Sequence, residues 1–76
     1  MKTINFGYFS NEVIAKLVAC CLNEDPRIAC AVFPVAGTNH RITKVTSVKA
    51  LDEESEVVKR AVKWASHFAD ESYTKG

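Results

Sequence analysis

Residues Arg27 to Ala50 read RIACAVFPVAGTNHRITKVTSVKA, and this stretch decides the fold because it holds two extended segments joined by a short turn. The first segment, Ile28 to Ala36, is apolar at almost every position, so both of its faces need shelter from water. The tetrapeptide Gly37 to His40 supplies the turn. The sequence therefore predicts a central β-hairpin in a sheet that needs covering.

The size of the chain limits what one core can contribute. A core in a chain of 76 residues supplies only about 3 to 5 kcal/mol, so additional support such as self-association is expected. Ten basic and nine acidic side chains leave a net charge of +1, which is neither the cationic signature of a nucleic-acid coat nor the acidic signature of a DNA mimic. We expect a single compact domain over residues 1–76, with residues 72–76 as a frayed tail.

The cysteines and the N-terminus bear on the cellular compartment. Cys20, Cys21 and Cys30 are an odd set with two adjacent members, which is a poor disulfide framework. The first residues lack the features of a signal peptide, and no apolar run approaches the roughly 18 residues of a membrane span. We therefore expect a reduced cytoplasmic protein that does not enter a membrane.

The N-terminal third predicts a strand followed by a helix. Residues Lys2 to Phe9 alternate, which places Ile4, Phe6 and Tyr8 together on one buried face. Ser10 is expected to cap a helix that begins at Asn11 and ends near Asn23. The apolar stripe that faces the core in this helix is Ile14, Leu17, Val18, Cys21 and Leu22. Cys20 lies beside it, and both neighbouring cysteines are expected to act as small apolar filler.

The central segments predict two further strands. The first covers Arg27 to about Val35, with Pro34 near its end at a sheet edge or bulge, because proline donates no ladder hydrogen bond. The second covers Arg41 to about Lys49. Its apolar residues recur every third position, which predicts either a bulge near Lys44 or an early end to the strand.

The C-terminal third predicts an amphipathic helix. Leu51 to Ser55 opens this helix, with Asp52 as the cap. Val57 and Trp64 widen its buried stripe on one side, so we expect Trp64 to be partly exposed or to lie at an interface. The stripe itself comprises Val58, Ala61, Val62, Ala65, Phe68 and Ala69.

The predicted order is β-α-β-β-α, an α+β fold with a three-stranded mixed sheet and both helices packed on one face. The helical crossover makes the first two strands parallel, and the short turn makes the last two antiparallel. The natural arrangement is a truncated ferredoxin-like unit with strand order 1-3-2. It leaves one face of the sheet bare and one edge of the first strand unpaired, so we expect a homodimer or a partner protein to cover them.

The sequence carries no established catalytic signature. The turn from Gly37 to His40 resembles the Gly-Ser-His-His turn of HicA-like toxin ribonucleases, and this resemblance implies a catalytic role for His40. It covers four residues, and here a strand precedes the first helix, unlike in that family. A zinc site is not expected, because adjacent residues on a helix, such as Cys20 and Cys21, point about 100° apart. No cofactor is expected.

Two binding functions remain. The first is a small non-catalytic module, typical of regulators and inhibitors including those of phages, that docks onto a partner protein and forms a homodimer. Its expected partner-binding residues are Trp64, Phe33 and Tyr8, because aromatic anchors dominate interfaces. The alternative is a regulator that binds nucleic acid through basic side chains. Those side chains are Lys59, Arg60, Lys63, Arg41 and Lys44.

Overall fold

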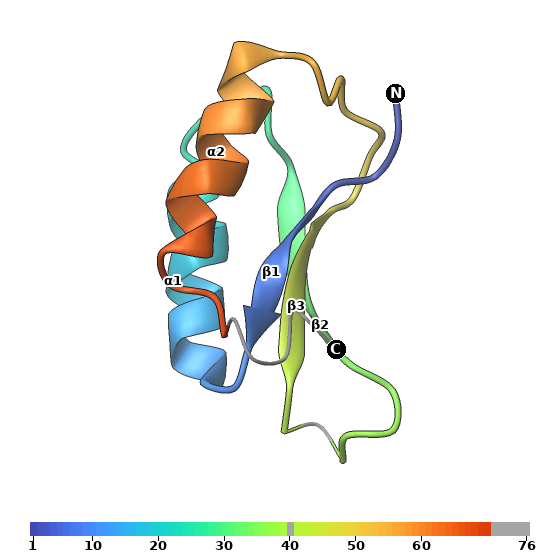
Figure 1. Cartoon of the computed structure of the whole chain (residues 1–76), viewed down its shortest axis with the longest axis vertical. Helices are drawn as coiled ribbons and strands as arrows, with labels where there is room; N and C mark the ends of the chain where they lie inside the picture. Colours follow the sequence, from blue (N-terminus) through green and yellow to red (C-terminus); the bar gives the residue numbers. More distant parts are fainter. Residues whose placement is uncertain (40, 71–76) are drawn as a thin grey trace.

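The computed structural model describes residues 1–39 and 41–70, so His40 and the predicted tail, residues 72–76, lie outside the described residues. Five elements follow one another in the predicted order (Figure 1). They are β1 (Asn5–Phe9), α1 (Glu12–Leu22), β2 (Cys30–Pro34), β3 (Thr43–Ser47) and α2 (Glu56–Ser66).

The sheet has the order β1-β3-β2, and both helices lie against the same face of it (Figure 1). The predicted fold class, strand order and helix layer are therefore confirmed. The prediction of a mixed sheet needs one correction. β1 and β2 run in the same direction, but β3 lies between them and pairs antiparallel with both, so every hydrogen-bonded pair in the sheet is antiparallel.

A bulge in β1 changes which side chains reach the core. The register with β3 shifts between Asn5 and Gly7, so Phe6 and Phe9 are both buried. The extra residue reverses the alternation beyond it, and Tyr8 lies on the opposite face, beside Lys44. The prediction that Tyr8 shares the buried face of Phe6 is therefore wrong.

β3 is regular and short. It pairs with β2 without a register shift, from Cys30 opposite Ser47 to Pro34 opposite Thr43. The alternative of an early strand end is therefore confirmed, and the bulge near Lys44 is not present. Pro34 ends the edge strand β2, as its missing N–H requires.

Two buried hydroxyl groups of β3 form hydrogen bonds with the backbone of β1 and of the residue before it. The Ile4 N–H donates to Ser47 Oγ at 2.8 Å, and Thr43 Oγ1 donates to the Phe9 carbonyl at 3.2 Å. Buried polar groups are costly unless they are hydrogen-bonded. The side chains of Ser47 and Thr43 therefore add hydrogen bonds at the two ends of the pairing between β1 and β3.

Both helices begin later than the sequence predicted. Asn11, not Ser10, caps α1, because its Oδ1 accepts hydrogen bonds from the Val13 and Ile14 N–H groups. Asp52 accepts from the Glu54 N–H in a turn that precedes α2, and the cap position of α2 is Ser55. An Asp two residues before a backbone N–H stabilises a local turn as readily as a helix.

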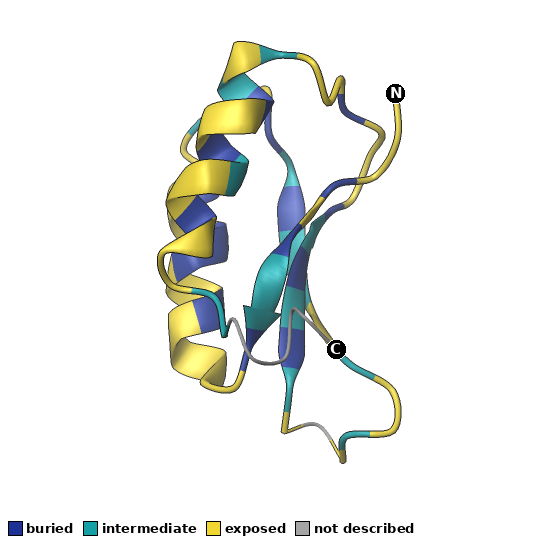
Figure 2. Ribbon diagram, viewed as in Figure 1, coloured by how far each residue is buried: buried dark blue, intermediate teal, exposed yellow. Residues whose placement is uncertain are grey.

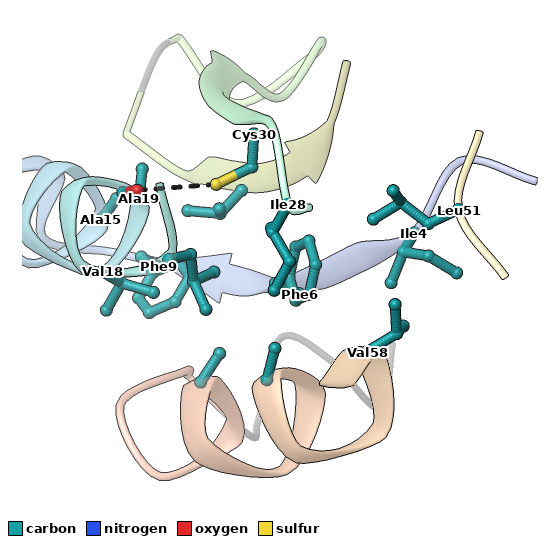
Figure 3. Close-up of a cluster of buried hydrophobic side chains, with 14 residues drawn as sticks. Ile4, Phe6, Phe9, Ala15, Val18, Ala19, Ile28, Cys30, Leu51 and Val58 are labelled. Atoms are coloured by element: carbon teal, nitrogen blue, oxygen red, sulfur yellow. Dashed lines mark hydrogen bonds between the residues drawn. The ribbon is translucent and has the colours of Figure 1, made fainter. Parts of the chain in front are cut away.

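The core lies between the helix layer and the sheet (Figure 3). Buried residues occupy the sides of the strands and helices that face each other (Figure 2). Cys30 is buried in this layer, and its thiol contacts the Ala19 carbonyl of α1 at 3.6 Å. The Asn23 side chain also bonds both backbone groups of Cys30, which ties the end of α1 to β2.

Candidate docking surfaces

α1 is apolar on nearly all sides. Every residue from Glu12 to Leu22 is apolar except Glu12 and Lys16, and these two form an ion pair at 3.3 Å. A helix that is apolar all round is normally buried all round. As far as the described residues show, only one side of α1 is buried, and it comprises Ala15, Val18, Ala19 and Leu22.

The rest of α1 faces outward. Leu17 is 60% exposed, and the apolar residues one helical turn before and after it are exposed as well. Figure 2 shows the outer surfaces of the two helices as mostly exposed. The exposed apolar residues of α1 are Val13, Ile14, Leu17, Cys20 and Cys21.

Two aromatic residues extend this surface onto α2 and the turn after it. Trp64 is 38% exposed and Phe68 is 49% exposed, and their ring centroids lie 5.0 Å apart. Cys21 and Trp64 line one groove between the helices, of about 360 Å³. Ile14 and Phe68 line a smaller one of about 150 Å³. We call the five exposed residues of α1, together with Trp64 and Phe68, the helix-layer patch.

The helix-layer patch corrects the predicted core. Ile14, Leu17 and Cys21 were expected in the buried stripe of the first helix, and Phe68 in that of the last. α1 is rotated so that Ala15 and Ala19 meet the sheet instead, and α2 ends at Ser66, before Phe68. The available sequence signal was the near absence of polar residues in α1, which left no side of it suited to water.

The second surface is the face of the sheet opposite the helices, which no element of residues 1–39 and 41–70 covers. Because side chains alternate along a strand, the partners of the buried residues in β2 and β3 lie on this face. Phe33 and Tyr8 both lie directly opposite Lys44, from the two sides of β3. We call this surface the open face. Its residues are Asn5, Tyr8, Ala31, Phe33, Lys44 and Thr46.

The predicted partner-binding residues therefore separate into two groups. Phe33 and Tyr8 lie on the open face with Lys44 between them, whereas Trp64 belongs to the helix layer on the other side of the sheet. Trp64 is partly exposed, as its marginal position in the apolar stripe predicted.

The predicted basic residues are divided in the same way. Lys59, Arg60 and Lys63 are exposed on the outer side of α2. Lys59 pairs with Glu54 at 3.4 Å, which offsets part of the positive charge. Lys44 lies within β3 on the open face, and Arg41 is exposed two residues before this strand begins.

Asp25 and Cys30, which lie outside both surfaces, have shifted pKa values. The Arg27 guanidinium hydrogen-bonds Asp25 at 2.8 Å and lowers the pKa of that carboxyl group. Burial raises the pKa of the Cys30 thiol, so this group is a poor nucleophile.

Within residues 1–39 and 41–70, no three His, Cys, Asp or Glu side chains are grouped to hold a metal ion. No helix in these ranges is long and apolar enough to cross a bilayer.

Comparisons with known proteins do not identify a family, so the function is inferred from the geometry of the chain. No protein-family model matches the chain, and no curated protein or solved structure is significantly similar to it. The resemblance of the turn to HicA-like ribonucleases falls on His40, which lies outside the described residues.

Proposed function

We propose that this chain is a small non-catalytic binding module, a regulator or inhibitor, that docks onto a partner protein through the helix-layer patch. The exposure of α1 is the observation that supports this proposal, because an almost entirely apolar helix has one side without cover among the described residues. Large exposed apolar patches are rare on monomeric soluble proteins and typical of interaction sites.

The energetics favour an apolar partner surface. Full burial of one Leu or Phe side chain stabilises by about 1.5 to 3 kcal/mol, so covering Leu17 and Phe68 gives a substantial driving force. Trp64 supplies a large, partly exposed indole beside the grooves, and tryptophan is enriched among the residues that dominate binding energy.

The proposed compartment is the cytoplasm. Cys20 and Cys21 are free and exposed within the helix-layer patch, and oxidising conditions would expose them to disulfide exchange. A reducing environment keeps both side chains as small apolar contacts.

The experiment is affinity capture from cells that express the tagged chain. The variants Trp64→Ala and Leu17→Asn are compared with the wild type, with Lys16→Ala as the matched control on the same helix. We expect one protein to be recovered by the wild type and the control, and recovery to fall at least about tenfold, or 1.4 kcal/mol, in both patch variants.

Urea unfolding of the same variants separates loss of binding from loss of folding. Both patch variants should remain folded, because both side chains are partly or largely exposed. Equal recovery of the partner by all variants would contradict the proposal. A loss of about 3 kcal/mol or more in Trp64→Ala would place the indole in the core and remove it from the docking surface.

A further inference from the structure

Positive charge is concentrated in the hairpin despite the nearly neutral total. Between Arg27 and Leu51 the sequence contains no Asp or Glu. Arg27 is paired with Asp25, which leaves Lys44 on the open face and two exposed cations at the ends of β3, Arg41 before the strand and Lys49 after it. The residues that β1 adds to the open face are Asn5 and Tyr8, so the described part of this face contains no carboxylate.

Aromatic side chains flank the middle of this basic track. Phe33, Lys44 and Tyr8 form one row across the three strands, and neighbouring strands lie about 4.8 Å apart. Phe33 is 40% exposed although it belongs to a strand, so part of its ring is accessible. An exposed sheet with aromatic side chains next to cations has the two features that single-stranded nucleic acids require: stacking surfaces for bases and charges for phosphates.

We propose that the open face binds single-stranded nucleic acid, with one base stacked on Phe33, a second base against Tyr8, and phosphates along Arg41, Lys44 and Lys49. Ala31 and Thr46, which pair with each other on this face, are small enough to let the strand approach the sheet closely. A base stacked on an aromatic ring contributes about 1 to 3 kcal/mol and requires no particular sequence.

Charge argues against a second copy of the chain as the occupant. Two open faces packed against each other would bring two copies of Lys44 together, with Arg41 and Lys49 at the ends of each β3, and no carboxylate on the described part of either face to compensate. Like charges held in such a contact repel each other at low dielectric. A polyanion such as single-stranded nucleic acid is instead attracted by the same cations.

This activity goes beyond protein docking and uses the opposite side of the sheet. The helix-layer patch and the open face share no residue, so either proposal can fail without the other. A chain with both surfaces would connect a partner protein to a nucleic acid.

The test is fluorescence anisotropy of labelled single-stranded RNA and DNA of about 12 nucleotides, titrated with the purified chain at several salt concentrations. We expect log K to fall with log salt with a slope of about −2, since each neutralised phosphate of a single strand contributes about −0.7. Phe33→Ala should weaken binding about fivefold or more. Lys44→Gln should reduce the magnitude of the slope by about 0.7, and the control Lys16→Gln should do neither.

Three outcomes would overturn the proposal. One is the absence of binding at low salt. Another is a loss in Lys63→Gln that matches the loss in Lys44→Gln, which would assign binding to the basic side of α2. The third is a dimer in light scattering that Phe33→Asp dissociates, because a second copy would then occupy the open face.

Discussion

Gly7 is the residue at which the first strand becomes irregular. It has a φ of +142°, a value that side chains rarely allow, and a Cβ added there would lie 2.7 Å from the Ala69 Cβ. The strand therefore reaches its bulge where the chain after α2 packs directly against the backbone. A glycine in β1 thus allows the close approach of the two segments.

Gly7→Ala should lower the free energy of unfolding by about 2 to 5 kcal/mol, because backbone strain and overpacking add. Urea denaturation measures this change. Gly37→Ala is the matched control, since Gly37 has a φ of +83° but, among the described residues beyond its chain neighbours, no heavy atom lies within 4 Å of the added Cβ. It should cost only about 1 to 2 kcal/mol. The double variant Gly7→Ala with Ala69→Gly should recover the part of the lost unfolding free energy that comes from overpacking. No recovery would show that the added Cβ does not meet the Ala69 side chain.

Cys30 makes stability depend on pH on the alkaline side. Burial raises the pKa of its thiol above the ordinary value of 9.0, so between pH 9.0 and the folded-state pKa the folded chain keeps a proton that the unfolded chain has lost. Unfolding is then coupled to proton release. The contribution of Cys30 is fully present below the unfolded pKa and is lost as the pH rises through the folded pKa.

The expected result is that the stability difference between the wild type and Cys30→Ala is constant below about pH 8 and shrinks toward about pH 10. Urea unfolding at both pH values measures it, and the comparison cancels every contribution that the two proteins share. A difference that does not change with pH would show that the thiol is solvated in the folded chain.

At the scale of elements, α1 depends on a cap that lies one residue beyond the predicted one. Asn11 Oδ1 accepts from the Val13 N–H at 2.9 Å and from the Ile14 N–H at 3.4 Å. Asn11→Ala should therefore cost about 1 kcal/mol in unfolding free energy, whereas Ser10→Ala should stay within about 0.5 kcal/mol. Thermal or urea unfolding of the two variants decides which residue is the cap. A larger loss in Ser10→Ala than in Asn11→Ala would show that Ser10 caps the helix.

The two sides of α1 should respond differently to substitution. Leu22 is 6% exposed, so Leu22→Ala should cost about 2 to 5 kcal/mol through transfer and cavity terms. Leu17→Asn should change the unfolding free energy of the isolated chain by about 1 kcal/mol or less, because its side chain already meets water. A large loss for Leu17→Asn would mean that α1 is rotated toward the orientation that the sequence predicted.

Over the whole molecule, the arrangement of the elements was predictable from the sequence. The side of α1 that faces the sheet was not. A helical crossover and a short hairpin turn restrict three strands to few arrangements, which is why the order 1-3-2 was predicted correctly. The side of α1 that faces the sheet was not determined, because a helix with only two polar residues allows more than one buried stripe.

The bulge in β1 was not predicted, although a glycine inside a strand pattern, here Gly7, is a signal for one. The alternation from Lys2 to Phe9 fits a regular strand, but the Gly7 N–H donates to Asn5 Oδ1 at 2.9 Å where the register shifts. Ala69, more than sixty residues away in the sequence, leaves no room for a Cβ at Gly7. The rotation of α1 and the bulge in β1 determine which residues form the two candidate surfaces. The helix-layer patch follows from the rotation of α1, and the open face gains Tyr8 through the bulge.

The helix-layer patch is tested most directly by photo-crosslinking in cells that express the chain. The photoreactive residue p-benzoylphenylalanine replaces Leu17 in one variant and Lys16, its exposed neighbour on another side of α1, in the control. A discrete adduct with one protein from position 17, and none from position 16, is the predicted result. No adduct from position 17, or equal adducts from both positions, would contradict the assignment of this surface to a partner protein.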